Sequence, residues 1–217
     1  NVAVAPLPGA SDSGVAVCTI ESAVAGHHDF VVTYPHSNDA GFEQVVLGVD
    51  VRSLPVHDYT DMWWAGFGEN GWGVSITQHG DIQFIVLYVY DAAGKPTWYV
   101  LPTGTWNAAQ TAYTGALYRP SGSLFSAYNG QAFKANTPVG TATVTYTGTG
   151  TATLTYTIDG ISGTKNIQRQ IFAADDGLPK LTVNDIWWGG NEQNGWGFNI
   201  AQQGRVLMVG HVFLYNP

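Results

Sequence analysis

Tryptophan is the residue type with the clearest spacing in this 217-residue sequence. A Trp-Trp pair, six further residues and a Gly-Trp-Gly triplet occur twice, once from Trp63 and once from Trp187. An indole ring presents a flat apolar face and one N–H donor, which suits stacking on a sugar, on an aromatic molecule or on another protein. The candidate ligand-binding residues are the tryptophans of the two copies and one further along the first: Trp63, Trp64, Trp72, Trp98, Trp187, Trp188 and Trp196.

A structural explanation competes with binding for these rings. Neighbouring side chains on a strand point to opposite faces, so one Trp of each pair is expected to face inward as core and the other outward. The glycines on each side of Trp72 and Trp196 indicate bulges or close backbone approach. Such glycines are expected at a tight corner of a barrel as well as beside a bound ligand. The motif therefore predicts architecture more directly than function.

Histidine supplies the second candidate chemistry. Four of the six histidines lie near the N-terminal end, with Asp29 and Asp39 close by in the sequence: His27, His28, His36 and His57. Imidazole suits copper or zinc, so a secreted metal-binding protein, with copper favoured over zinc, is the first alternative function. The spacing matches no zinc signature, and an adjacent His pair on a loop is also compatible with simple solvation.

Hydrolysis is the second alternative, and the sequence supports it least. There is no Gly-x-Ser-x-Gly motif, and Cys18, the only cysteine, has no His at a readable spacing. Glu69 and Glu192 lie in the two repeat loops and resemble a glycosidase pair. They are offset by one residue when the copies are aligned, so they are not equivalent positions.

The two copies are similar well beyond the tryptophans. Residues 61–80 align with residues 185–204 without a gap and with eleven identities in twenty. Further on, the second copy gains one residue and ends after a hairpin, where the first continues into a third strand. Exposed sheet edges need a partner. The N-terminal strands are expected to supply it, or else a second molecule in a homodimer.

Short apolar or alternating runs separated by turn residues make up most of the chain, and no stretch shows a helical period with caps. The clearest of these runs are Phe30–Tyr34, Glu43–Val51, Gly73–Gln78, Ile82–Tyr90, Ala112–Tyr118 and Thr151–Asp159. The predicted fold is all-β, with an antiparallel up-and-down barrel-like unit over residues 59–173. An N-terminal β segment, residues 1–58, is predicted to form a second sheet with the partial repeat, residues 185–217.

Composition narrows the class of partner and the compartment. Charged residues are only 11% of the chain, the net charge is −8, and the eight basic residues are scattered, which disfavours nucleic acid and anionic membrane surfaces. No run is long enough to span a bilayer. Uncharged polar residues in place of charged ones are typical of extracellular β proteins, so a secreted, periplasmic or cell-surface bacterial protein is expected.

Several ordered blocks resemble a known sequence pattern. They are Trp63-Trp64…Gly71-Trp72-Gly73, Tyr90-Asp91…Trp98-Tyr99, Tyr113–Tyr118 and Asp159–Phe172. Together these blocks are similar to a Trp-rich repeat of exported proteobacterial proteins of unassigned function, over residues 61–217. The resemblance implies export and carries no activity. The leading hypothesis is therefore a non-enzymatic binding or surface-interaction protein whose partner is a small molecule, a glycan or a protein surface, bound at the barrel mouth or on outward Trp faces.

Overall fold

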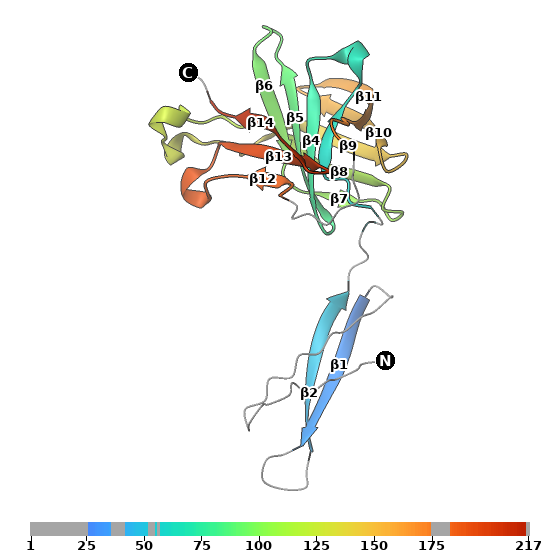
Figure 1. The fold of residues 1–217 in the computed structure, drawn as a ribbon. Coiled ribbons are helices and arrows are strands. Elements are labelled where there is room, and N and C mark those ends of the chain that lie inside the picture. Colours follow the sequence, from blue (N-terminus) through green and yellow to red (C-terminus); the bar gives the residue numbers. More distant parts are fainter. Residues whose placement is uncertain (1–25, 36–41, 52–54, 56, 175–182, 216–217) are drawn as a thin grey trace. The chain divides into compact units, whose positions relative to one another are not determined.

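The structure is a computed structural model that describes residues 26–35, 42–51, 55, 57–174 and 183–215. Strands dominate these residues, as predicted. The helices among them are four short 3₁₀ turns: η1 (Phe67–Glu69), η2 (Phe125–Ala127), η3 (Gly130–Ala132) and η4 (Asn191–Gln193). None of the described helices has the length and apolar character to cross a membrane. The chain divides into two compact units, Asn1–Ser53 and Leu54–Pro217 (Figure 1).

The first unit contains a β-hairpin. Strands β1 (Gly26–Pro35) and β2 (Phe42–Val51) pair antiparallel, with Phe30 opposite Leu47. The two strands predicted here are confirmed. The expected loop at His27 and His28 is wrong, because both residues belong to β1. The apolar run Val15–Ile20 also predicts a strand from the sequence, and it lies outside the described residues.

The second unit is built on a closed eight-stranded barrel. Its strands are β3 (Asp61–Trp64), β4 (Gly73–His79), β5 (Ile82–Tyr90), β6 (Pro96–Leu101), β8 (Ala112–Tyr118), β9 (Pro138–Tyr146), β10 (Thr151–Ile158) and β11 (Ile161–Arg169). Within the sheet β11 pairs with β3. The pairing of Val100 (β6) with Tyr118 (β8) joins the remaining strands and closes the barrel. Short β7 (Gly104–Trp106) pairs with the edge of β8. The predicted up-and-down barrel is confirmed.

Alternation along each strand fills the barrel interior. Val74 and Ile76 of β4 and Ile85 of β5 are fully buried there. One end is closed by an aromatic cluster, in which Tyr59 stacks on Tyr146 with ring centres 3.5 Å apart. Buried Gln83 accepts a 2.8 Å hydrogen bond from the Tyr146 hydroxyl. This end of the barrel is therefore packed with side chains.

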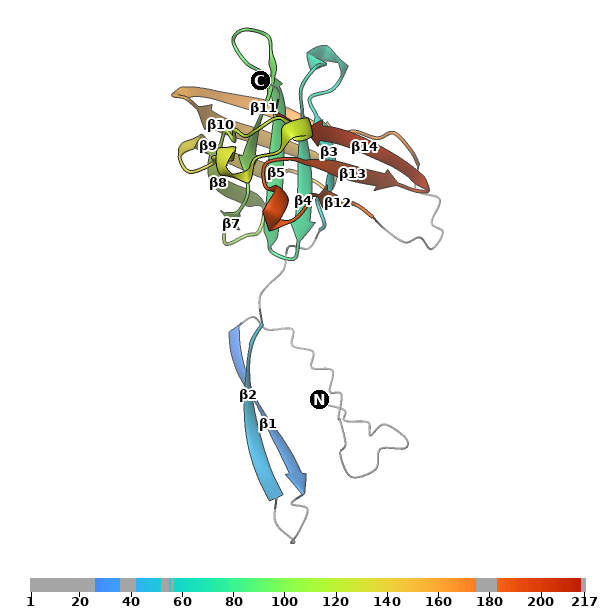
Figure 2. The ribbon, with the colours of Figure 1, turned by 90° about the vertical axis from the view of Figure 1, so that its left-hand side faces the viewer.

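The partial repeat forms a three-stranded sheet of its own, called here the C-terminal sheet: β12 (Asp185–Trp187), β13 (Gly197–Gln203) and β14 (Val206–Phe213). The predicted composite sheet with the N-terminal strands is wrong, because β1 and β2 pair only with each other. In both views of the fold the C-terminal sheet lies beside β3, β4 and β5 (Figure 2). The C-terminal sheet packs through one of its faces and not through a hydrogen-bonded edge. It covers the outer face of β4–β6, where side chains such as Val86 are buried.

The two copies of the repeat have the same local fold at equivalent sequence positions. Gly66 and Gly190 both have φ of 84°, in the region that favours glycine. The indole N–H of Trp72 donates to Glu69 at 3.2 Å, and that of Trp196 donates to Gln193 at 3.1 Å. The shared sequence thus specifies a strand, a 3₁₀ turn and a second strand. Gln193, not Glu192, occupies the position of Glu69, in agreement with the alignment.

Candidate functional site

The outer wall of β4–β6 and the C-terminal sheet meet along a contact that we call the seam. At its centre the ring of Tyr88 (β5) stacks on the ring of His211 (β14), with 3.5 Å between ring centres and 13° between planes. Beside them Trp98 (β6) contacts Phe213 at 6.2 Å and Tyr215 at 5.0 Å between ring centres. The seam thus brings together aromatic residues more than 100 positions apart in the sequence.

The seam also concentrates polar atoms that have no partner in the protein. Seven buried side-chain atoms of the described residues lack a hydrogen bond: Ser75 Oγ, Thr77 Oγ1, Tyr88 OH, Trp98 Nε1, Asn199 Oδ1, His211 Nδ1 and Tyr215 OH. The first four belong to β4–β6 and the other three to β13, β14 and the residues after β14. Buried polar atoms are normally satisfied, and each one left alone costs about 1–3 kcal/mol. The seam therefore presents hydrogen-bonding capacity that its own side chains do not use.

Burial keeps the seam uncharged. Desolvation lowers the pKa of His211 to about 4, so its imidazole is neutral at neutral pH. The same effect raises the pKa values of Tyr88 and Tyr215 well above that of a free phenol. The aromatic residues at the centre of the seam are therefore hydrogen-bonding groups without charge.

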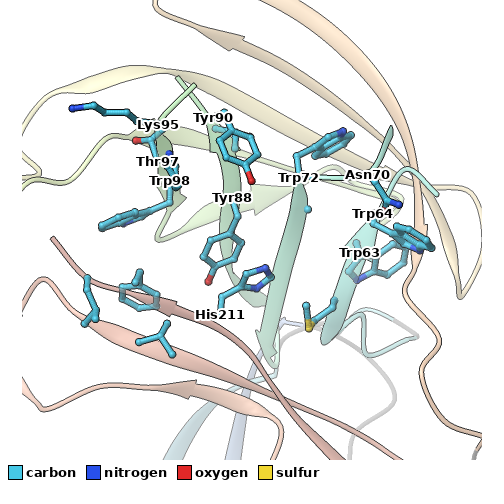
Figure 3. A pocket seen from close by; sticks show the side chains of 18 of the residues that line it. Trp63, Trp64, Asn70, Trp72, Tyr88, Tyr90, Lys95, Thr97, Trp98 and His211 are labelled. Carbon is cyan, nitrogen blue, oxygen red and sulfur yellow. The ribbon is translucent and has the colours of Figure 1, made fainter. Parts of the chain in front are cut away.

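One end of the seam opens into a groove of about 960 Å³, which we call the aromatic groove (Figure 3). Tyr88 and His211 lie at its centre, with Trp98 on one side and Trp72 and Trp64 on the other. Lys95 is the one charged side chain among its described lining residues. Asn70, Thr97 and Gln170 add neutral polar groups. The groove thus combines several aromatic surfaces with mostly neutral donors and acceptors.

A second cavity, the side pocket, lies on the other side of the Trp98, Phe213 and Tyr215 wall. Its volume is about 550 Å³, and its lining is mainly apolar: Phe84, Val100, Phe133, Ile186, Trp188 and Trp196. Trp98 and Tyr215 line both cavities. The side pocket and the aromatic groove are therefore adjacent and share one aromatic wall.

The structure separates the seven candidate tryptophans into different roles. Trp63 is 1% exposed inside the barrel, and its neighbour Trp64 faces outward, as the alternation predicts. Trp63, Trp64, Trp72 and Trp98 are among the residues that line the aromatic groove, whereas Trp188 and Trp196 line the side pocket. Trp187 lines neither cavity and is 44% exposed, because the three described strands of the C-terminal sheet leave it partly uncovered.

Sequence reasoning missed the central pair of the seam. Tyr88 lies in an apolar run that predicts only a strand, and His211 was not assigned to any site. The outward position of Tyr88 follows from strand alternation, since Leu87 faces the core. What the sequence did not show is which surface covers that outward face.

The described histidine candidates are divided between the two units. His27 and His28 are adjacent on β1, so their rings lie on opposite faces of the hairpin. His27 Nε2 is 3.2 Å from Asp29 Oδ1, and His57, in the second unit, meets Tyr59 edge-on. His36 lies outside the described residues. Over the described ranges, no three His, Cys, Asp or Glu side chains converge on a position for a copper or zinc ion.

Comparison of the chain with models of known protein families, with curated protein sequences and with solved structures finds no match. The likeness to exported Trp-rich proteins therefore stays a prediction from the sequence. The function has to be inferred from the geometry of the groove itself.

Proposed function

We propose that this is an exported, non-enzymatic binding protein that holds a neutral carbohydrate in the aromatic groove. One observation carries the proposal: the groove combines exposed aromatic surface with residues whose buried polar atoms have no partner in the protein. Tyr88, Trp98, His211 and Tyr215 line the groove, and each contributes one such atom. A ligand rich in hydroxyl groups supplies the complementary donors and acceptors if it reaches into the open end of the seam.

The aromatic rings favour a sugar over other polar molecules. A pyranose ring has an apolar face of C–H groups, and such a face stacks well on an indole or phenol ring. Tyr90 is 56% exposed at the groove and is accessible without any movement of the protein. Trp72 and Trp98 add indole surfaces further along. The volume of about 960 Å³ is at the upper end of small-ligand sites, which suits an oligosaccharide.

The charge of the groove favours a neutral ligand. Cation-binding aromatic cages depend on electrostatic attraction, whereas the described lining of this groove holds one Lys and no carboxylate. A single Lys95 at the edge is also a weak basis for selecting an anion, given the net charge of −8. Neutral sugars, with hydroxyl groups as their only polar chemistry, match this lining best.

The same lining supports binding over hydrolysis. A glycosidase needs two carboxyl groups beside the scissile bond. Glu69, one of the two candidate acids, lies outside the groove lining and pairs with Lys165 at 2.6 Å. Low overall charge and abundant uncharged polar residues support an extracellular or periplasmic location, where glycans are frequent partners.

Isothermal titration calorimetry of the full chain with cellotetraose, xylotetraose, maltotetraose and chitotetraose tests the proposal. At least one of them is expected to bind one-to-one with a favourable enthalpy. Tyr90→Ala and Trp98→Ala should each weaken that binding by at least about tenfold, the loss of roughly 1.4 kcal/mol of contact. Circular dichroism establishes that both variants keep the wild-type fold.

Trp187→Ala is the matched control, since it removes a half-exposed Trp that lies outside the groove. It is expected to bind the same sugar as the wild type does. No binding of any of the four sugars, or equal weakening by Trp187→Ala and Tyr90→Ala, contradicts the proposal.

A further inference from the structure

The barrel has a second, open end opposite its aromatic cluster. There the interior widens into a cavity of about 760 Å³, which we call the barrel mouth. Its wall is formed by inward side chains of three strands: Leu87 and Val89 of β5, Tyr99 of β6, and Leu154, Tyr156 and Ile158 of β10. An eight-stranded barrel has an interior wide enough to hold one small ligand.

Burial changes along the depth of the mouth. Leu154 and Leu87, at 1% and 2% exposed, belong to the packed core and form the floor. Val89, Tyr156 and Ile158 are only partly buried and form the upper wall. The barrel therefore encloses apolar surface that its own side chains cover at the floor and leave open above. Filling that space with an apolar molecule removes this surface from water, which favours binding.

An ionic contact crosses the rim of the mouth. Lys165 (β11) donates to Glu69 (η1) at 2.6 Å, and Glu69 also accepts the indole N–H of Trp72 at 3.2 Å. The Lys165 ammonium lies 5.9 Å from the centre of the Trp72 ring. Alternation along β4 places Trp72 on the same side as Val74, toward the interior. We call this trio the clasp, because it ties the loop before β4 to β11 beside the mouth.

The second copy of the repeat shows that the 3₁₀ turn forms without a carboxylate at the position of Glu69. Gln193 holds the position of Glu69, and the Trp196 indole donates to it in the same way. The 3₁₀ turn and its Trp anchor therefore form with a neutral amide. The negative charge at position 69 is needed only for the contact with Lys165, which is a feature of the mouth and not of the repeat.

From these observations we propose that the barrel mouth is a second binding site, for a small uncharged apolar molecule, with the clasp retaining it. The apolar wall sets the class of ligand. Both cations at the rim, Lys165 and Arg119, are already paired with carboxylates, at 2.6 and 3.2 Å, so neither is available to select an anionic head group. The mouth adjoins the aromatic groove and shares Trp72, Val89 and Tyr90 with it, but its remaining apolar wall favours a different class of ligand.

Fluorescence titration with N-phenyl-1-naphthylamine, a neutral apolar probe, tests the assignment. We expect saturable one-to-one binding with a blue shift, and energy transfer that falls in Trp72→Phe. Ile158→Asp, which places a charge in the wall at a residue that does not line the aromatic groove, should weaken binding by at least about tenfold. Val206→Asp is the matched control, at a 49% exposed valine outside all three cavities, and should bind as the wild type does. If Ile158→Asp does not fold, Ile158→Trp tests the same point by filling the cavity.

Stopped-flow release of the probe tests the clasp. Glu69→Gln reproduces the residue of the second copy, so the turn should be kept while the ion pair is lost, and dissociation should become several times faster. The proposal is overturned if the probe does not saturate, if both Ile158 variants bind normally, or if binding is lost in Trp188→Ala, which would place the probe in the side pocket. Competition by decanol but not by the groove's tetrasaccharides supports two separate sites, whereas displacement by the sugars contradicts it.

Discussion

The ring of Tyr88 lies nearly parallel to the ring of His211, with 3.5 Å between their centres, and this contact joins the two copies of the repeat. In the first copy Ser75 pairs with Val86 across β4 and β5, and in the second Asn199 pairs with His211 across β13 and β14. His211 therefore occupies the position of Val86. The two copies pack through equivalent faces, namely the faces that point away from the barrel interior.

This packing predicts a pH-dependent stability. His211 has a pKa of about 4 in the folded state and close to its ordinary value of about 6.5 when unfolded. Between these values the unfolded chain binds a proton that the folded chain does not, so stability falls as pH is lowered from about 6.5 to 4. The steepest loss is about 1.4 kcal/mol per pH unit, reduced by solvent screening because His211 is partly exposed.

Urea unfolding of the wild type and of His211→Phe between pH 4 and 7 measures this effect. Phe keeps a ring against Tyr88 and removes the titrating group. The wild type should therefore lose more unfolding free energy than His211→Phe as the pH falls. A difference that does not change with pH would show that His211 is not buried in the seam.

The paired tryptophans allow a matched comparison of stability. Trp63 is buried and donates its indole N–H to the carbonyl of Tyr59 at 3.1 Å, whereas Trp187, its counterpart, is 44% exposed. Trp63→Ala should cost about 3–5 kcal/mol of unfolding free energy, as expected for a large buried aromatic residue. Trp187→Ala should cost only about 1 kcal/mol. Equal losses in chemical denaturation would contradict the difference in burial.

Arg169 is predicted to secure the closure of the barrel. Its guanidinium lies 5.2 Å from the Trp63 ring centre, and Nη1 donates to Asp61 at 2.9 Å. It also reaches the backbone carbonyls of Thr149, Thr60 and Asp58. Because both charges of the ion pair are largely buried, Arg169→Met should lower the unfolding free energy by about 3 kcal/mol.

Arg119→Met is the control for this prediction. Arg119 pairs with Asp159 at 3.2 Å, but both side chains are about half exposed, so the loss should stay below about 1 kcal/mol. Thermal unfolding of the two variants gives the comparison directly. A larger effect at Arg119 than at Arg169 would mean that β11 and β3 are held together by other contacts.

The sequence was most informative about the strands of the barrel. The bounds predicted for Ile82–Tyr90 and Ala112–Tyr118 agree with β5 and β8, because turn residues mark their ends and their apolar runs are continuous or alternating. Short β7, with three residues, has no such pattern and was missed. The order of the strands follows from the tight connections, since each strand of a meander pairs with the next.

The packing of the C-terminal sheet was not predictable in the same way. Ser75 and Thr77 give β4 a polar alternation that normally marks a solvent-exposed face, yet both are buried in the seam. Reasoning from exposed edges then favoured pairing with the N-terminal strands, which does not occur. For the site, the tryptophan motif identified most of the groove's indole rings, but Tyr88 and His211 meet only because two sheets stack.

The central claim is that a neutral carbohydrate occupies the aromatic groove, and the indole N–H resonances of the eight tryptophans test it most directly. In a ¹⁵N-resolved NMR titration with the tetrasaccharide that binds most tightly in calorimetry, the resonances of Trp98, Trp72 and Trp64 should shift in a saturable way. Those of Trp187 and Trp106 should stay in place. Shifts confined to Trp187 and Trp188, or no saturable shift of any indole, would contradict a carbohydrate site in the aromatic groove.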